Sequence, residues 1–133
     1  MAELYELTVA DAAAQIRTAK LSPVDLVKSI LDRIRNLEPK LKAWVYLDEE
    51  AVLRDAKEKE SDVISGIPIG LLHGVPIGLK DIYYTASIPT TACSKVYSDF
   101  IPEYDATTVA KLKQAGAIIL GKTVTTEFAC ADP

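Results

Sequence analysis

The sequence contains few of the residues that build metal sites and disulfide frameworks. Of its 133 residues, two are cysteine and one is histidine, and Cys93 and Cys130 form no C-x-x-C pair. With a single histidine and two cysteines far apart in the sequence, a cysteine/histidine zinc site is not expected. We therefore expect free, buried thiols in a reducing compartment.

Positive charge and long apolar runs are also scarce. The 15 lysine and arginine residues stand against 19 acidic ones, and the net charge is −4. Without a basic stripe, direct binding of nucleic acid is not expected. The longest apolar runs are far too short to span a membrane, and the first residues carry acids where a signal peptide needs positive charge. These absences predict a cytoplasmic protein that does not bind membranes.

What is present is enough apolar sequence, 49% of residues, for one domain with a core. A first helix is predicted over residues 8–20, because Thr8 and Asp11 resemble a capping box before an alanine-rich run. A second helix is predicted from Ser22, a good N-cap followed by proline, up to Glu38 and Pro39. Its apolar residues recur every three or four positions, which favours one buried stripe.

The rest of the chain reads as strands joined through helices. Short runs over residues 43–47, 75–82 and 117–120 predict strands, the last of them buried and parallel. A helix capped by Asp48 should reach about Lys59, and another should begin at Asp105 and end before Gly116. The segment between Tyr83 and Asp105 is predicted to be a long loop with one helical turn.

This order predicts an α/β fold with a largely parallel sheet flanked by helices. Two or three strands make a poor sheet by themselves, so we expect the fold to be incomplete in this chain.

The candidate for chemistry is Lys80. Alternate side chains of a strand share a face, so Lys80 should lie with Pro76 and Gly78, opposite Ile77 and Leu79. The small residues leave space for another backbone, and an amine drawn into such a site loses water and can act as a neutral base. The alternative is a solvated lysine at a strand end, paired with Asp81.

Other candidates are weaker. His73 precedes a glycine and is more typical of a hydrogen-bonded loop residue than of a catalytic one. Cys93 has no evident histidine partner. The triplet from Gly121 to Thr123 looks like the end of a phosphate-binding loop but lacks the upstream glycine, which favours a structural role.

The residues around Lys80 resemble the lysine-bearing strand of the amidase signature family. The similarity begins with the run LHGVPIGLKD over residues 72–81 and continues through residues 89–94, 104–110, 116–123 and 126–129. The opening helices are also similar, so the resemblance covers essentially the whole chain. It implies the N-terminal part of a mixed β-sheet fold flanked by helices, incomplete in this chain. Residues 1–133 would be one N-terminal segment of an amidase domain, with a helical start over about 1–40 and an α/β portion over about 41–133.

The departures from the family pattern are few. Cys93 stands where glycine is common, and His73 stands where a small residue is common. The run from Thr123 to Phe128 is similar to general amidases, whereas the A subunit of glutamyl-tRNA(Gln) amidotransferase more often has Asn-Met-Asp-Glu-Phe there. This difference favours a general amidase.

The resemblance implies hydrolysis of a carboxamide to a carboxylate and ammonia by a Ser-cis-Ser-Lys triad, without a metal or organic cofactor. Both serines of the family lie downstream of Ala129, beyond Pro133, so Lys80 is the only catalytic residue carried over and the isolated chain should be inactive. The partner implied is a small-molecule amide. A homo-oligomer, amidotransferase subunits and a role as a non-catalytic module stay open.

Overall fold

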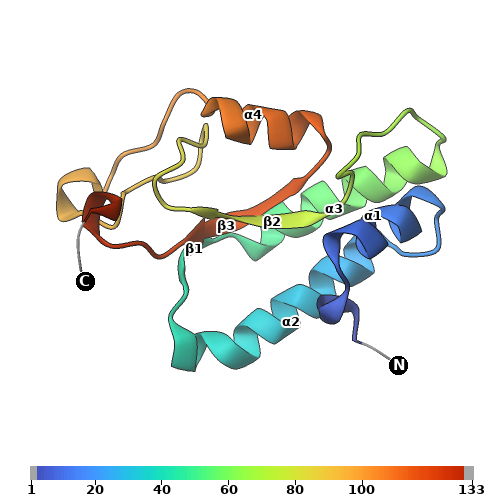
Figure 1. The fold of residues 1–133 in the computed structure, drawn as a ribbon, viewed down its shortest axis with the longest axis horizontal. Coiled ribbons are helices and arrows are strands. Elements are labelled where there is room, and N and C mark those ends of the chain that lie inside the picture. The colour runs from blue at the N-terminus through green and yellow to red at the C-terminus, as the bar shows by residue number, and fades with distance from the viewer. Residues whose placement is uncertain (1–2, 131–133) are drawn as a thin grey trace.

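The computed structural model describes residues 3–130 and places a three-stranded sheet between two layers of helices (Figure 1). Helices α2 and α3 lie on one face of the sheet and α4 lies on the other. The elements are α1 (Val9–Arg17), α2 (Pro23–Leu41), β1 (Trp44–Leu47), α3 (Glu49–Ile64), β2 (Pro76–Lys80), α4 (Thr107–Gln114) and β3 (Ile118–Thr123), with short 3-10 turns at Leu4–Glu6, Lys95–Tyr97 and Glu127–Ala129.

Three helices begin at the side-chain caps that the sequence predicts. The Thr8 hydroxyl accepts the Asp11 N–H at 3.1 Å, and the Ser22 hydroxyl accepts two N–H groups of the first turn of α2. The Asp48 carboxylate accepts the Ala51 N–H at 2.9 Å. Each bond satisfies a donor that the first turn of a helix leaves free.

Four predicted helix boundaries were wrong. Helix α1 ends at Arg17 rather than at Lys20, and Ala19 beyond it has a positive φ of 54°. Helix α2 runs past Pro39 to Leu41, because Pro39 removes only one bond in the last turn and the Glu38 carboxylate accepts the Ala43 and Trp44 N–H groups beyond it. Helix α3 continues five residues beyond the predicted end.

Asp105 does not cap α4. The N-cap is Ala106, which makes no side-chain capping bond. The Asp105 carboxylate instead accepts the Ala86 N–H at 2.8 Å and binds Lys113 at 2.9 Å, so it fastens the long loop to the helix.

The sheet has the order β1-β3-β2, with β3 in the centre. β2 is parallel to β3 and β1 is antiparallel to it. The sheet is therefore mixed, as the family resemblance implies, and not largely parallel, as the order of elements predicts. Pro76 lies on an edge strand, as its missing N–H requires. The α/β class with flanking helices is confirmed.

A bulge in β3 changes the faces of its residues. Ile77 pairs with Ile119 and Gly78 pairs with Gly121, so Leu120 is the extra residue. Ile119 packs on the α4 side. In a regular strand, Ile119 and Lys122 would point to opposite faces, because they are three positions apart. With the bulge, Lys122 lies on the α4 side with Ile119 and contacts the loop there.

Apolar side chains fill both faces of the sheet. Ile118 and Leu120 pack against α2 and α3, where Val27 and Leu31 are almost wholly buried. Ile119 and the β2 side chains pack against Val109 and its neighbours from α4. Full burial of one such side chain stabilises the fold by about 2 kcal/mol.

Within residues 3–130, no helix is both long enough and apolar enough to cross a membrane.

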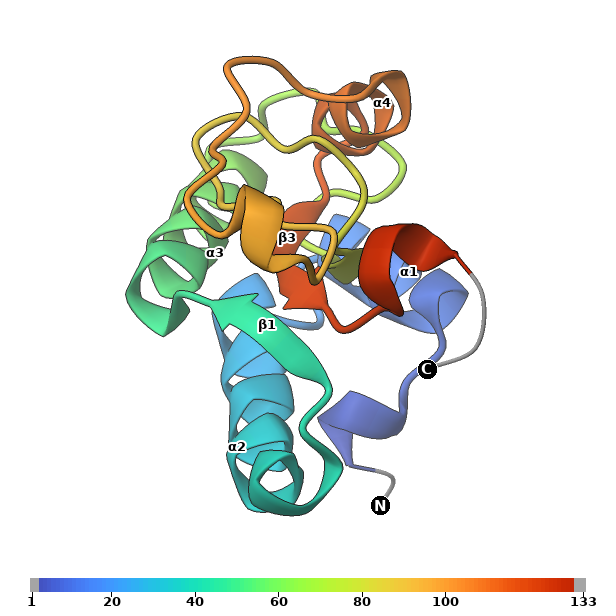
Figure 2. The same ribbon diagram turned by 90° about the vertical axis from the view of Figure 1, so that its left-hand side faces the viewer.

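Viewed from the loop end of the molecule, β1 and the long loop lie in front of β3 (Figure 2).

We predict that Gly121→Ala destabilises the chain by about 3 kcal/mol, because an added Cβ would lie 2.1 Å from the Tyr46 carbonyl oxygen and push β1 off the sheet. Gly66→Ala is the matched control, since a Cβ there meets nothing within 4 Å although its φ is +68°. We expect it to cost about 1 kcal/mol. Urea unfolding measures both, and equal losses would contradict the packing at Gly121.

Candidate active site at the carboxyl end of strand β2

Lys80 is the last residue of β2, paired in register with Thr123. It shares a face with Gly78, opposite the buried Leu79, as the sequence predicts. However, Lys80 is exposed. The expectation that it is drawn out of water is therefore not met within residues 3–130.

The group that comes close to Gly78 is a side chain rather than another backbone. A Cβ added at Gly78 would lie 2.8 Å from the Trp44 ring and 3.4 Å from the Thr123 methyl group. Trp44 reaches across β3 from β1, so the indole packs on the same face that carries Lys80. The close approach at this glycine was predicted, but its partner was not.

Asp81, the next residue, is fully buried and organises the loop that follows. Its carboxylate accepts the Thr91 N–H at 3.1 Å, the Thr91 hydroxyl and the Cys93 N–H at 3.3 Å. Its backbone carbonyl accepts the Ala92 N–H at 2.8 Å. Among residues 3–130, no ion pair joins Lys80 to Asp81, so the simple strand-end pair is not formed.

The lysine that faces Asp81 is Lys122 of β3. Its side chain is fully buried, and its Nζ lies 3.8 Å from Asp81 Oδ1. The amine donates to the Tyr83 carbonyl at 2.6 Å and to the Thr90 hydroxyl at 2.7 Å. Burial lowers the pKa of Lys122 to about 8, and the Asp81 carboxylate opposes part of that shift.

Sequence reasoning gave Lys122 only a structural role, as the middle of a failed phosphate-loop match. The available signal was a lysine directly after the buried run of residues 118–121. A charged residue that continues a buried strand is rarely left unpaired.

A second turn docks against the Asp81 loop. The Phe128 N–H donates to the Ala92 carbonyl at 2.9 Å, and the Thr125 N–H donates to the Cys93 sulfur at 3.4 Å. The buried Ser94 hydroxyl donates to Glu127 at 2.7 Å. The segments around residues 92 and 127 therefore form one hydrogen-bonded junction at the end of β2.

Backbone strain gathers at this junction. Ala92, Cys93, Phe128 and Ala129 all have positive φ, between 49° and 54°. Each such non-glycine residue costs of order 1 kcal/mol, and such strain concentrates at functional sites. Cys93 thus occupies a position suited to glycine, which agrees with the departure noted in its sequence.

Aromatic side chains line the outer side of the junction. Tyr97 packs against Phe100 and Phe128 with ring centroids 5.5 and 5.8 Å apart, and Tyr84 packs against Phe100 at 5.2 Å. Together with Ile82 they line a cavity of about 250 Å³. These contacts hold the loop and the second turn together.

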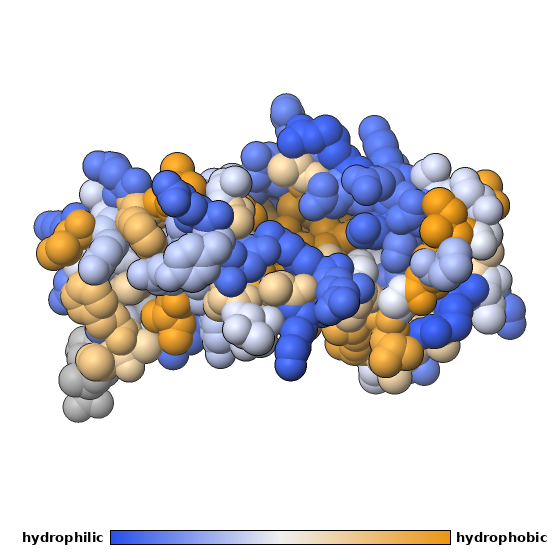
Figure 3. All heavy atoms as spheres, turned by 90° about the horizontal axis from the view of Figure 1, so that it is seen from above, coloured by the Kyte–Doolittle hydropathy of each residue, from blue (hydrophilic) through white to orange (hydrophobic). Residues whose placement is uncertain are grey.

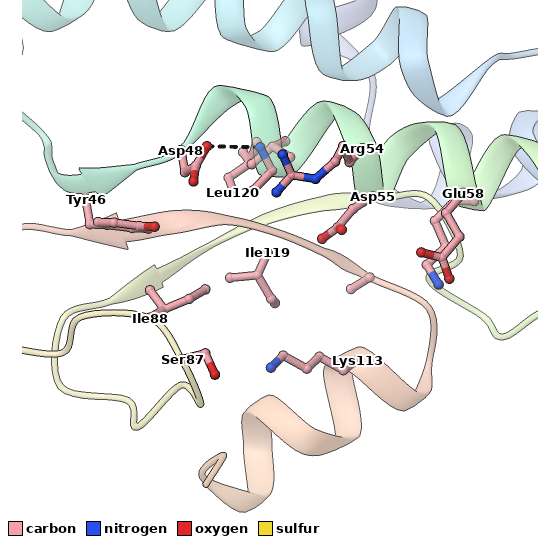
Figure 4. A pocket seen from close by; sticks show the side chains of 14 residues that line it. Tyr46, Asp48, Arg54, Asp55, Glu58, Ser87, Ile88, Lys113, Ile119 and Leu120 are labelled. Carbon is pink, nitrogen blue, oxygen red and sulfur yellow. Dashed lines mark hydrogen bonds between the residues drawn. The ribbon is translucent and has the colours of Figure 1, made fainter. Parts of the chain in front are cut away.

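A larger cavity, of about 450 Å³, lies between α3, α4 and β3. Figure 4 shows the Asp55 and Glu58 side chains on one side, Lys113 on the other and Ile119 between them. From above, hydrophilic residues surround apolar ones near the middle of the molecule (Figure 3). Neither Lys80 nor Asp81 lines this cavity, so the cavity is separate from the candidate site at the end of β2.

The remaining candidates have structural surroundings. His73 is buried, and its Nε2 lies 3.0 Å from the Lys59 carbonyl, which confirms a hydrogen-bonded loop residue. Both cysteines are free, but Cys93 is only half-buried and Cys130 is exposed, so the prediction of buried thiols was wrong. Residues 3–130 contain no group of three histidine, cysteine or acidic side chains that could hold a metal ion.

The family model for amidases matches residues 25–131, which is most of the chain. The chain belongs to the amidase family. This amidase-family chain is 43% identical over 126 residues to the putative amidase AmiD of Mycobacterium bovis, covering 95% of this chain and 26% of that protein. It is 42% identical over 127 residues to the A subunit of the glutamyl-tRNA(Gln) amidotransferase of Carboxydothermus hydrogenoformans, covering 96% and 26%.

The amidase fold is found in solved structures. The peptide amidase of Stenotrophomonas maltophilia superimposes with a TM-score of 0.84 at 36% identity, covering 92% of this chain and 26% of that one. A bacterial aryl acylamidase of the amidase signature family has a TM-score of 0.88, and at 24% identity it shows the fold alone. The chain thus spans about a quarter of the length of these relatives.

We predict that stability depends on pH through Lys122. Its pKa is about 8 in the folded chain and 10.5 when unfolded, so between these values the unfolded state binds more protons. The free energy of unfolding should therefore rise by about 2 kcal/mol from pH 7 to pH 10, relative to Lys122→Met. Urea unfolding at both pH values measures this difference. A difference that stays constant, or that falls as the pH rises, would show that the amine is not desolvated.

Proposed function

We propose that the complete gene product containing these residues is an amidase that hydrolyses a carboxamide to a carboxylate and ammonia. The observation that carries the proposal is the placement of Lys80, within the family's motif, at the end of β2 and beside the strained junction. An exposed amine there can be reached by a nucleophile from another segment.

Lys80 would be the ultimate base of a Ser-cis-Ser-Lys triad. A neutral Lys80 amine would accept a proton through a bridging serine, which would activate a second serine to attack the amide carbon. The C–N bond would then break as the proton returns from Lys80 to the leaving nitrogen, which departs as ammonia, and water would hydrolyse the acyl-serine to the carboxylate. Since Lys80 is exposed within residues 3–130, the segment that brings the serines would also have to exclude water from it, so that its neutral form is favoured.

Residues 1–133 would form one N-terminal segment of the amidase domain. Among residues 3–130, no hydrogen bond joins a serine to Lys80, and the buried Ser94 is held by Glu127. The 133-residue chain alone would therefore lack a nucleophile for the lysine to activate, and it would be inactive. No metal or organic cofactor takes part in this scheme.

The alternative is the A subunit of a tRNA-dependent amidotransferase. The 42% identity to the Carboxydothermus hydrogenoformans protein favours it, and the Thr123 to Phe128 run, which is similar to general amidases, opposes it. In this case the partners would be the other amidotransferase subunits rather than a small amide alone.

We predict that Lys80→Ala lowers the kcat of the complete gene product by at least about 1000-fold, since removal of one member of a catalytic triad has an effect of this size or larger. Ammonia release from benzamide and propionamide measures it. Lys111→Ala, an exposed lysine on α4, is the control and should keep full activity. Wild-type turnover by Lys80→Ala would refute the assignment. The 133-residue chain assayed alone should release no ammonia.

We predict that the complete gene product, purified by an affinity tag from its native host, comes down without stoichiometric partners. Mass spectrometry of the purified sample identifies any other chain present. Recovery of the other amidotransferase subunits at equal molar amounts would replace the stand-alone amidase with the alternative.

A further inference from the structure

We propose that Lys122 is a positioning residue for Lys80, which rests on the amidase function proposed above. Lys122 is fully buried, and within residues 3–130 no hydrogen bond joins its amine to Lys80. Its effect would pass through Asp81 and the loop that Asp81 and Lys122 hold between them.

The Lys122 amine lies in the interior of the protein. Lys122 is the bulkiest of the fully buried side chains in residues 3–130, with 0% of its surface exposed. An amine in such a place is retained only where partners compensate for its lost hydration. The Tyr83 carbonyl and the Thr90 hydroxyl accept two of its hydrogens, at 2.6 and 2.7 Å.

The two partners of the Lys122 amine belong to the segment that follows Lys80. We call residues 81–94 the turn that follows Lys80. Tyr83 lies near its start and Thr90 near its end, so one amine ties both parts of this turn to β3. Asp81 lies 3.8 Å away and holds the Thr91 and Cys93 backbone N–H groups. All these contacts are made within the chain, so they do not depend on any segment outside it.

Backbone hydrogen bonds link this turn to Lys80. The Asp81 N–H donates to the Thr123 carbonyl at 3.0 Å, and the Ile82 and Tyr83 N–H groups donate to the Lys80 carbonyl at 2.7 and 3.1 Å. The backbone of Lys80 is therefore clamped between β3 and the turn. With Lys122 removed, the Asp81 carboxylate is left buried without its cation, and Tyr83 and Thr90 lose the amine that ties them to β3.

The geometry also explains why Lys122 lies on the correct side of the sheet. The bulge at Leu120 turns Lys122 towards the loop, while Lys80 and Thr123 face the opposite side. The two lysines thus serve different faces, one as the anchor of the turn and one as the reacting group that the turn holds in place.

The test compares Lys122→Met with Lys113→Met in the complete gene product. Lys113 is the matched control because it also pairs with an aspartate, Asp105, at 2.9 Å, but its side chain is partly exposed. For Lys122→Met we expect about a 100-fold loss of kcat on benzamide with KM within about twofold of wild type, because misplacement of a reacting group slows chemistry without weakening binding. Lys113→Met should change neither constant.

Hydrogen exchange gives a readout that needs no amidase activity. In Lys122→Met, peptides covering residues 81–94 should exchange about tenfold faster, while peptides of α2 keep their protection. Wild-type exchange in this loop together with wild-type kcat would overturn the proposal, as would a raised KM with an unchanged kcat. If α2 peptides also lose protection, Thr90→Val replaces the variant, since it removes only the hydroxyl partner. Thr90→Val must then show a smaller loss of kcat, an unchanged KM and faster exchange in residues 81–94. If it does not, the proposal is overturned.

Failure of the proposed function remains distinguishable. If Lys80→Ala keeps wild-type turnover, the amidase assignment to Lys80 fails whatever Lys122→Met does. If Lys80→Ala abolishes turnover while Lys122→Met behaves as wild type in both kcat and exchange, only the positioning role fails.

Discussion

The contact between a buried ammonium group and a buried carboxylate organises the end of the molecule that carries Lys80. Lys122 of β3 and Asp81, the first residue after β2, are both fully buried and lie 3.8 Å apart. Burial lowers the pKa of Lys122, and an amine that has lost its hydration needs partners that compensate. Each is supported by further hydrogen bonds, and these bonds belong almost entirely to the loop after β2. The pair therefore couples the sheet to the segment that surrounds Lys80.

The strained turns gain a physical explanation from this arrangement. Ala92 and Cys93 adopt positive φ beside the carboxylate that holds the Cys93 N–H, and Phe128 adopts it where its own N–H meets the Ala92 carbonyl. Unfavourable backbone conformations of this kind persist only where surrounding contacts enforce them. Here the enforcing contacts are a buried network on one side and a cluster of aromatic rings on the other.

Much of the fold could be predicted from local chemistry, whereas the site needed tertiary information. Thr8, Ser22 and Asp48 cap helices because their side chains act on adjacent backbone, which a sequence shows directly. Asp105 carries the same signal but is used by distant partners. Lys80 was chosen as the candidate base through its motif, and its catalytic role stays a prediction. The role of Lys122 was not found, because it depends on a bulge at Leu120 and on a loop more than 30 residues away.

The chain belongs to the amidase family, and the exposed Lys80 amine stands at the end of β2. The decisive measurement is a crystal structure of the complete gene product. The account predicts a Lys80 side chain shielded from water, with its Nζ about 2.6–3.2 Å from a serine hydroxyl supplied by another segment. A Lys80 amine that is still in bulk water in that structure, with no serine within reach, would contradict the account.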